Sequence, residues 1–88
     1  MRIIKVTAMW CMSCLVMQKV YKKAFSGYDN LELIEYDFDD DAEKLIDLNV
    51  GQILPLLIIY QNDEEVKRIA GEKSLKQIKE ILDNIYNA

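Results

Sequence analysis

The chain has 88 residues, of which 51% are hydrophobic and 30% are charged, and its net charge is −4. A chain of this size forms one core, because separate domains arise only beyond roughly 250 residues, so we expect a single domain over residues 1–88. Clustered positive charge supplies much of the affinity of proteins for phosphate backbones, and this acidic chain is therefore not expected to bind nucleic acid.

Membrane and export segments are not expected either. The longest mostly apolar runs are shorter than the roughly 20 residues that cross a bilayer. The first residues, Met1 to Lys5, lack the apolar stretch and cleavage site of a secretory signal. We therefore expect the chain to be cytoplasmic and to have no membrane partner. A monomer is the expected state, although the sequence does not fix it.

Apolar residues alternate between the period of strands and that of helices, and they predict seven elements in the order βαβαββα. A strand, a helix and a strand in succession favour a parallel pair, and the hairpin that follows adds antiparallel pairing. The predicted fold is thus α/β, with a mixed four-stranded sheet flanked by three helices. The expected strands are Arg2–Thr7, Leu31–Asp37, Pro55–Tyr60 and Val66–Ala70.

The three helices have recognisable starts or ends. The first begins at the cysteine pair and stops near Gly27, a residue suited to closing a helix. Two pairs of residues have the form of a capping box, in which a side chain at the helix start and one three residues later satisfy each other's backbone N–H. These pairs are Asp40 with Glu43 and Ser74 with Gln77. The second helix is expected to have an apolar side formed by Ala42, Leu45, Ile46 and Leu48.

Cys11 and Cys14 are the only cysteines, and the chain has no histidine. The pair follows the first strand, which places Cys11 near the amino terminus of the first helix and Cys14 inside its first turn. Unpaired N–H groups and the helix dipole favour a thiolate at Cys11, and Cys14 is close enough to attack a mixed disulfide formed there. We predict that Cys11 attacks and Cys14 resolves, with the Cys11–Cys14 disulfide as the redox group and no other cofactor.

Two other interpretations of the pair stay open on the residues alone. Cysteines that are neighbours by chance behave as small buried hydrophobic residues. The segment Met9 to Cys14 also has the spacing M-x-C-x-x-C, and soft thiolate and thioether ligands select Cu(I). It resembles small copper chaperones, so a Cu(I) or Zn(II) carrier is the alternative function. Those domains have the order βαββαβ and end on a strand, whereas this chain is expected to end on a helix.

The cysteine motif and a distant proline together resemble the thioredoxin-like family. Trp10-Cys11-x-x-Cys14 follows the first core strand, and Leu54-Pro55 opens the most apolar strand. Other segments that match the family pattern are Asp37-Phe38-Asp39, Val50-Gly51, and Gly71 followed by the helix from Ser74. The resemblance covers nearly the whole chain. It implies a thioredoxin-like fold, a cis Leu54–Pro55 bond beside the disulfide, and a substrate site that includes Trp10, Leu54 and Pro55.

Several positions depart from the family pattern. Met12-Ser13 stands between the cysteines, where thioredoxins have Gly-Pro and glutaredoxins often have Pro-Tyr. Glutaredoxins bind glutathione with a pair of glycines before the last helix, and this chain has only the first of them, Gly71. Lys5 occupies the position of a buried Asp that assists proton transfer at the resolving cysteine. We expect Lys5 to extend to solvent from the end of its strand, and the alternative is that it takes part in that transfer.

The resemblance and the cysteine pair together predict a thiol–disulfide oxidoreductase that reduces disulfides of client proteins through Cys11 and Cys14. Its electron donor is expected to be a reductase or glutathione. The alternative within the same class is a glutathione-dependent, glutaredoxin-like reductase.

Overall fold

The computed structural model describes residues 1–88, and its helices and strands follow the predicted order. One mixed sheet has the strand order β2-β1-β3-β4, in which β1 is parallel to β2 and antiparallel to β3, and β4 is antiparallel to β3. The predicted fold class is therefore confirmed. The strands are Arg2–Thr7 (β1), Glu32–Asp37 (β2), Leu56–Gln61 (β3) and Glu64–Ala70 (β4). The helices are Met12–Phe25 (α1), Ala42–Leu45 (α2), the 3-10 turn Ile46–Leu48 (η1) and Leu75–Tyr86 (α3).

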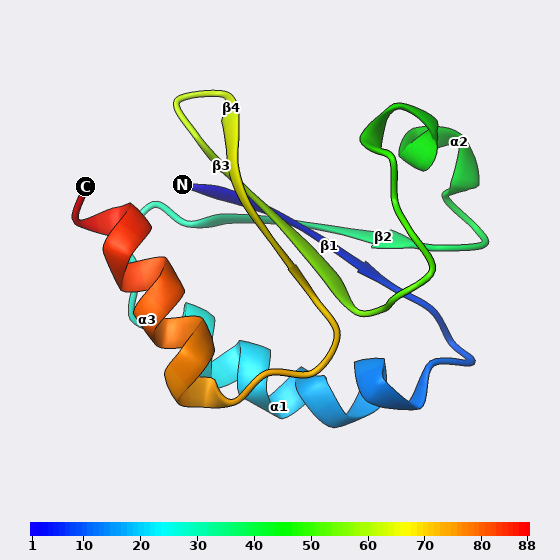
Figure 1. Cartoon of the computed structure of the whole chain (residues 1–88), viewed down its shortest axis with the longest axis horizontal. Helices are drawn as coiled ribbons and strands as arrows, with labels where there is room; N and C mark the ends of the chain where they lie inside the picture. Colours follow the sequence, from blue (N-terminus) through cyan, green and yellow to red (C-terminus); the bar gives the residue numbers. More distant parts are fainter.

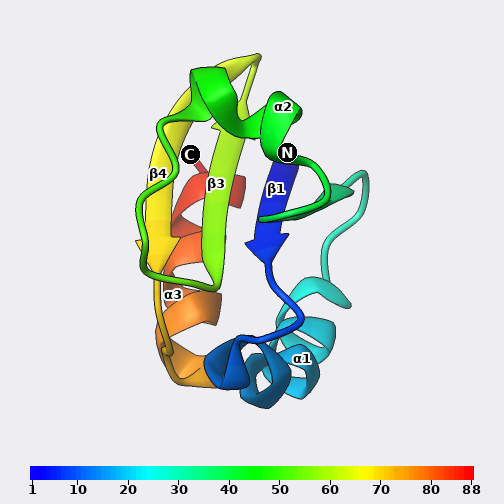
Figure 2. The same cartoon turned by 90° about the vertical axis from the view of Figure 1, so that its right-hand side faces the viewer.

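The sheet separates two hydrophobic clusters, because successive side chains of a strand point to opposite faces. The cross-strand pair Ile3 and Ile59 packs on the side of α1 and α3, and the pair Ile4 and Ile58 belongs to the cluster on the side of α2. Figures 1 and 2 show α1 and α3 together on one side of the sheet and α2 on the other. The two central strands are thus covered on both faces, which explains the continuous apolar run of β3.

The last helix begins as predicted. The Ser74 hydroxyl oxygen accepts the N–H of Gln77 at 3.1 Å, and the N–H of Ser74 donates to the side-chain oxygen of Gln77 at 2.9 Å. Ile78 and Leu82 of the same helix are buried in the core. None of the helices combines the length and the apolar character that a membrane crossing requires.

The hairpin between β3 and β4 is tighter than predicted, since β4 starts at Glu64 and not at Val66. Asn62 and Asp63 both have positive φ, of 54° and 64°. Two central residues with positive φ form the two-residue turn whose twist matches that of paired strands, so the pairing extends up to the turn.

The predicted capping box of the second helix is wrong. The N-cap is Asp41 and not Asp40, and no side chain caps the helix. The carboxylate of Asp41 accepts the N–H of Asp37 at 2.8 Å, while one oxygen of Asp37 accepts the N–H groups of Asp39 and Asp40, each at 2.9 Å. Short acidic side chains bond readily to nearby backbone, and here these turn contacts form in place of the cap.

The predicted apolar side of this helix is only partly correct. Leu45 is buried, but Ala42 and Ile46 are exposed. The helix is a single turn that tightens into η1, so residues spaced for a longer α-helix do not share one face.

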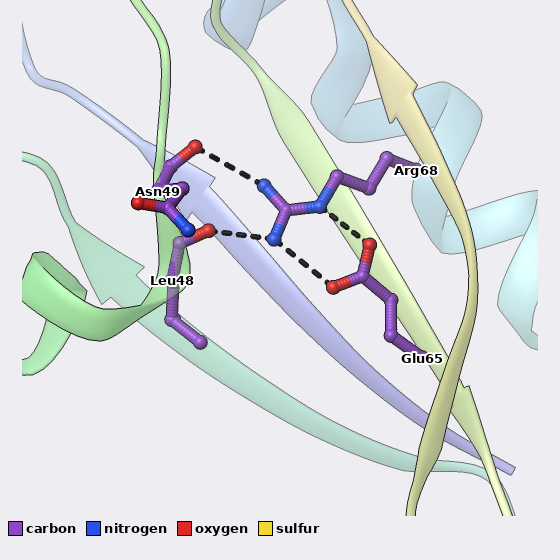
Figure 3. A network of polar contacts seen from close by, with 4 residues as sticks. All are labelled: Leu48, Asn49, Glu65 and Arg68. Carbon is purple, nitrogen blue, oxygen red and sulfur yellow. Dashed lines mark hydrogen bonds and ion pairs between the residues drawn. The ribbon is translucent and has the colours of Figure 1, made fainter.

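Arg68 of β4 holds the segment that leads from η1 to β3 (Figure 3). Its guanidinium donates to the carbonyl oxygens of Leu48 at 2.6 Å and Asn49 at 3.2 Å. It also forms two hydrogen bonds with the Glu65 carboxylate, at 2.6 and 3.0 Å. Asn49 closes the 3-10 turn in the left-handed conformation, with φ 52°. Arg68 therefore connects the approach to Pro55 with the edge strand of the sheet.

We predict that Arg68→Ala lowers the free energy of unfolding by about 1 to 3 kcal/mol, because two carbonyl groups and one carboxylate lose their donor. Arg68→Lys should restore only part of the loss, since lysine lacks the planar fork. Lys67→Ala, at an exposed neighbour on the same strand, should change stability by no more than about 0.5 kcal/mol. Urea unfolding measures all three, and equal losses in the two alanine variants would contradict the assignment.

Candidate active site

The cysteine pair lies at the end of the sheet where β1 ends and β3 begins. Because these strands are antiparallel, with Val6 opposite Leu56, the loop after β1 and the loop before β3 emerge at the same end. Cys14 and Leu54 belong to one hydrophobic cluster, against which Cys11 also packs. Figures 1 and 2 show the loop before β3 beside the start of α1. Tertiary structure thus joins the two distant segments of the predicted site.

Cys11 is the N-cap residue of α1. Its Sγ accepts the backbone N–H of Cys14 at 3.1 Å, and its own N–H donates to the carbonyl oxygen of Ala8 at 3.1 Å. The side chain is partly exposed. A sulfur in this position receives an N–H donor and faces the positive end of the helix dipole.

Cys14 has the opposite environment, since only 4% of its surface is exposed. Burial is the main reason that the pKa of its thiol rises from 9.0 to about 11. The hydrogen bond to Cys11 raises this pKa further, whereas a backbone hydrogen bond from Ala8 and the charge of Lys5 lower it. At neutral pH the chain therefore carries one accessible sulfur at a helix start and one buried, protonated sulfur.

Leu54 and Pro55 lie in the loop that leads into β3, and both residues are buried. The Leu54–Pro55 bond is cis, as the family resemblance predicts. The carbonyl oxygen of Pro55 accepts the N–H of Gly71 at 2.9 Å, while neither the N–H nor the C=O of Leu54 has a hydrogen-bond partner in the chain.

Exposed apolar side chains surround the cysteine loop, and we call them the apolar rim: Met9, Trp10, Met12 and Ile53. Trp10 is 61% exposed, and its indole N–H donates to the Asp39 carboxylate at 2.7 Å. Its ring also meets Phe38 edge to face. These contacts hold the indole in one orientation while most of its surface stays open to solvent.

Lys5 does not extend to solvent, so that expectation is wrong. Its side chain is 13% exposed, and its Nζ lies 2.5 Å from the carboxylate of Glu35. The parallel register of β1 and β2 places Lys5 directly beside Glu35, in the middle of β1 and not at its end. Both residues line a cavity of about 240 Å³ with Cys11 and Cys14.

Sequence reasoning missed three residues near the cysteines. The Ser13 hydroxyl donates to the Glu72 carboxylate at 2.8 Å, across 59 residues of sequence. Tyr21 of α1 lines the same cavity as Lys5 and Glu35. The apolar stripe of the first helix places Val20 or Tyr21 in the core but does not indicate a position near the cysteines, and no local pattern pairs Ser13 with Glu72.

The fold and its cysteine pair are those of a thioredoxin-like thiol–disulfide oxidoreductase. A model of the Thioredoxin family matches residues 1–84, and the chain belongs to that family. The order of the elements, βαβαββα, differs from the βαββαβ order of the copper chaperones.

Individual relatives are distant in sequence. Thioredoxin H2-1 of Oryza sativa subsp. japonica is 29% identical over 69 residues, which cover 78% of this chain and 49% of that protein. The thioredoxin of Staphylococcus haemolyticus is 26% identical over 77 residues, which cover 86% of this chain and 73% of that protein. The crystal structure of thioredoxin from Trypanosoma brucei brucei matches with a TM-score of 0.87 at 21% identity, covering 99% of this chain and 75% of that one. The chain thus spans about half the length of the rice relative.

We predict that limiting iodoacetamide near neutral pH labels Cys11 well before Cys14, because only Cys11 combines exposure with a position at the helix start. Labelling of Cys14 should rise about tenfold for each pH unit up to its pKa of about 11, since the thiolate fraction rises by that factor. Peptide mapping after brief treatment over a pH series measures both rates. Equal labelling, or a preference for Cys14, would contradict the difference between the two sulfurs.

Proposed function

We propose that this chain reduces disulfides of client proteins, with Cys11 as the nucleophile and Cys14 as the resolving thiol. The observation that carries this proposal is the unequal environment of the two sulfurs. Cys11 is accessible at the N-cap of α1, and Cys14 is buried and protonated three residues later. One sulfur is thus placed to meet a client, and the other is protected from it.

The reaction has two exchange steps. The Cys11 thiolate attacks one sulfur of the client disulfide, a mixed disulfide forms, and the other client sulfur leaves as a thiolate. Cys14 then loses its proton and attacks the sulfur of Cys11, which forms the Cys11–Cys14 disulfide and releases the second client thiolate. The client gains two electrons, and the cysteine pair loses two.

The electrons for the next cycle come from outside the chain. A reductase is the donor we propose, and glutathione is the alternative, which a comparison of turnover with each reductant distinguishes. We place the chain in the cytosol, because the redox poise of that compartment keeps such pairs as dithiols and their use there is catalytic more often than structural.

Client binding is proposed to use the apolar rim and the backbone of Leu54. The N–H and C=O of Leu54 are free to pair with an extended client segment, as an added strand pairs with a sheet edge. Pro55 lacks an N–H and so adds no competing donor beside the cysteines. The indole of Trp10, which its hydrogen bond to Asp39 holds in one orientation, supplies a large apolar contact.

We predict that Cys14→Ser traps mixed disulfides between Cys11 and the client, because release then needs a second molecule in place of an internal thiol. Turnover of a model disulfide protein should fall about 100-fold or more. Cys11→Ser is the matched control, and it should neither turn over nor capture the client. Non-reducing electrophoresis and a reduction assay measure these outcomes. A Cys14→Ser variant that turns over like the parent would refute the two-step assignment.

We predict that Trp10→Ala raises KM for a protein disulfide about tenfold, because a buried aromatic contact is worth more than about 1 kcal/mol at an interface. Its rate with a small aromatic disulfide should change little, since such a reagent needs no rim. Val66→Ala, at an exposed apolar residue of β4, is the control that leaves both values unchanged. Steady-state kinetics with the two substrates measure both effects. A loss of activity confined to the small disulfide would contradict the proposed role of the apolar rim.

A further inference from the structure

A positive charge lies in the core-facing column of β1. Alternation along this strand places Lys5 on the same face as Ile3, which is fully buried against α1 and α3. The neighbour of Lys5 on β3 is Leu57, which is also fully buried. A charge in such surroundings costs free energy unless it is paired, and here Glu35 provides the partner. Packing alone therefore does not account for a lysine at position 5.

The same cavity contains an unpartnered polar group. Tyr21 is 2% exposed, and its buried hydroxyl has no hydrogen-bond partner. Burial first, and then the negative charges of Cys14 and Cys11, raise the pKa of Tyr21, so the hydroxyl stays protonated. The Nζ of Lys5 lies 5.7 Å from the centre of the Tyr21 ring. Lys5 and Tyr21 thus line the same cavity as Cys14.

Lys5 is the only cation among the residues that line this cavity. The other charged or titratable groups facing it come from β2 and α1 or from the cysteine loop: Glu35, Asp37, Tyr21, Cys11 and Cys14. Cys14 also belongs to the hydrophobic cluster that includes Leu45 and Leu54. Glu35 is 62% exposed, so solvent screens its charge more than it screens that of Lys5.

We propose that Lys5, held in place by Glu35, is a positioning residue for the resolving step and stabilises the thiolate that Cys14 becomes when it attacks the mixed disulfide. This inference rests on the proposed function. The physical reason is that burial keeps Cys14 protonated, whereas attack requires the anion, and a nearby positive charge that is mostly buried, and so weakly screened by water, favours the anion. The charge of Lys5 does lower the pKa of Cys14.

In the resolving step Cys14 first loses its proton and then attacks the mixed disulfide. The proton of Cys14 leaves to solvent through the cavity, whose lining includes the exposed residues Met12, Leu15 and Gln18. The electron pair of the Cys14 thiolate forms the bond to the sulfur of Cys11. The bond between Cys11 and the client breaks, and the client sulfur leaves with its electron pair. Lys5 neither gives nor takes a proton.

Stopped-flow reaction with Ellman's reagent separates the two steps. The first thionitrobenzoate reports the attack by Cys11, and the second reports its displacement by Cys14. In Lys5→Met the first release should keep its rate, while the pH of half-maximal rate for the second should rise by about one unit, which is about tenfold slower below that pH. Lys5→Arg should restore most of the rate, because it keeps the charge.

Glu35→Gln is the matched control, because it breaks the same ion pair and leaves the positive charge. A purely structural ion pair would make Lys5→Met and Glu35→Gln slow the second release alike, and that result would overturn the proposal. We expect the second release in Glu35→Gln to be as fast as in the parent protein or faster. An unchanged second release in Lys5→Met would also overturn it.

Folding does not obscure this test. Lys5→Met replaces a mostly buried ammonium by an apolar side chain of similar length, and because the remaining Glu35 is exposed, no uncompensated buried charge is left to destabilise the fold. Lys5→Gln, which keeps a polar end group without the charge, should delay the second release in the same direction. A parent protein that gives no first release at Cys11 would refute the proposed function itself, and not the role of Lys5.

Discussion

The antiparallel pairing of β1 with β3 is the constraint on which the site depends. Both strands are buried on both faces, so their register is set by the fit of the two cores. The pair Val6 and Leu56 closes this ladder and brings the cysteine loop beside the cis Leu54–Pro55 bond. A shift of one residue would turn every side chain of β1 to the other face and remove Lys5 from the cavity.

The different environments of the two cysteines come from a short separation at a helix start. Three residues are enough to move from the N-cap, where the sulfur accepts a backbone N–H, to a turn that packs into the core. Cys11 therefore gains the field of the helix end together with access to solvent. Cys14 gains protection, but its burial opposes the ionisation that its attack requires. The cation of Lys5 lies where it can reduce that opposition.

Side chains from distant parts of the chain hold the segments around the cysteines. The bond from Trp10 to Asp39 orients the rim, and the bond from Ser13 to Glu72 ties the residues between the cysteines to the loop before α3. Arg68 likewise holds the segment between η1 and β3 through the carbonyl oxygens of Leu48 and Asn49 (Figure 3). A site carried by loops keeps its geometry only when such contacts limit the motion of the loops, and here the loop after β2, the loop before α3 and strand β4 supply them.

Local patterns in the sequence determined the order of the elements, the cysteine pair at the start of a helix and the capping box at Ser74, because each depends on residues a few positions apart. The family resemblance added the cis bond before Pro55. Only the tertiary structure decided the burial of Lys5 beside Glu35, the bond between Ser13 and Glu72, and the turn contacts that replaced a cap at Asp40. The first two join residues that only strand register and chain path bring together, and the third is a competition between acidic side chains for the same backbone donors, which spacing alone does not resolve.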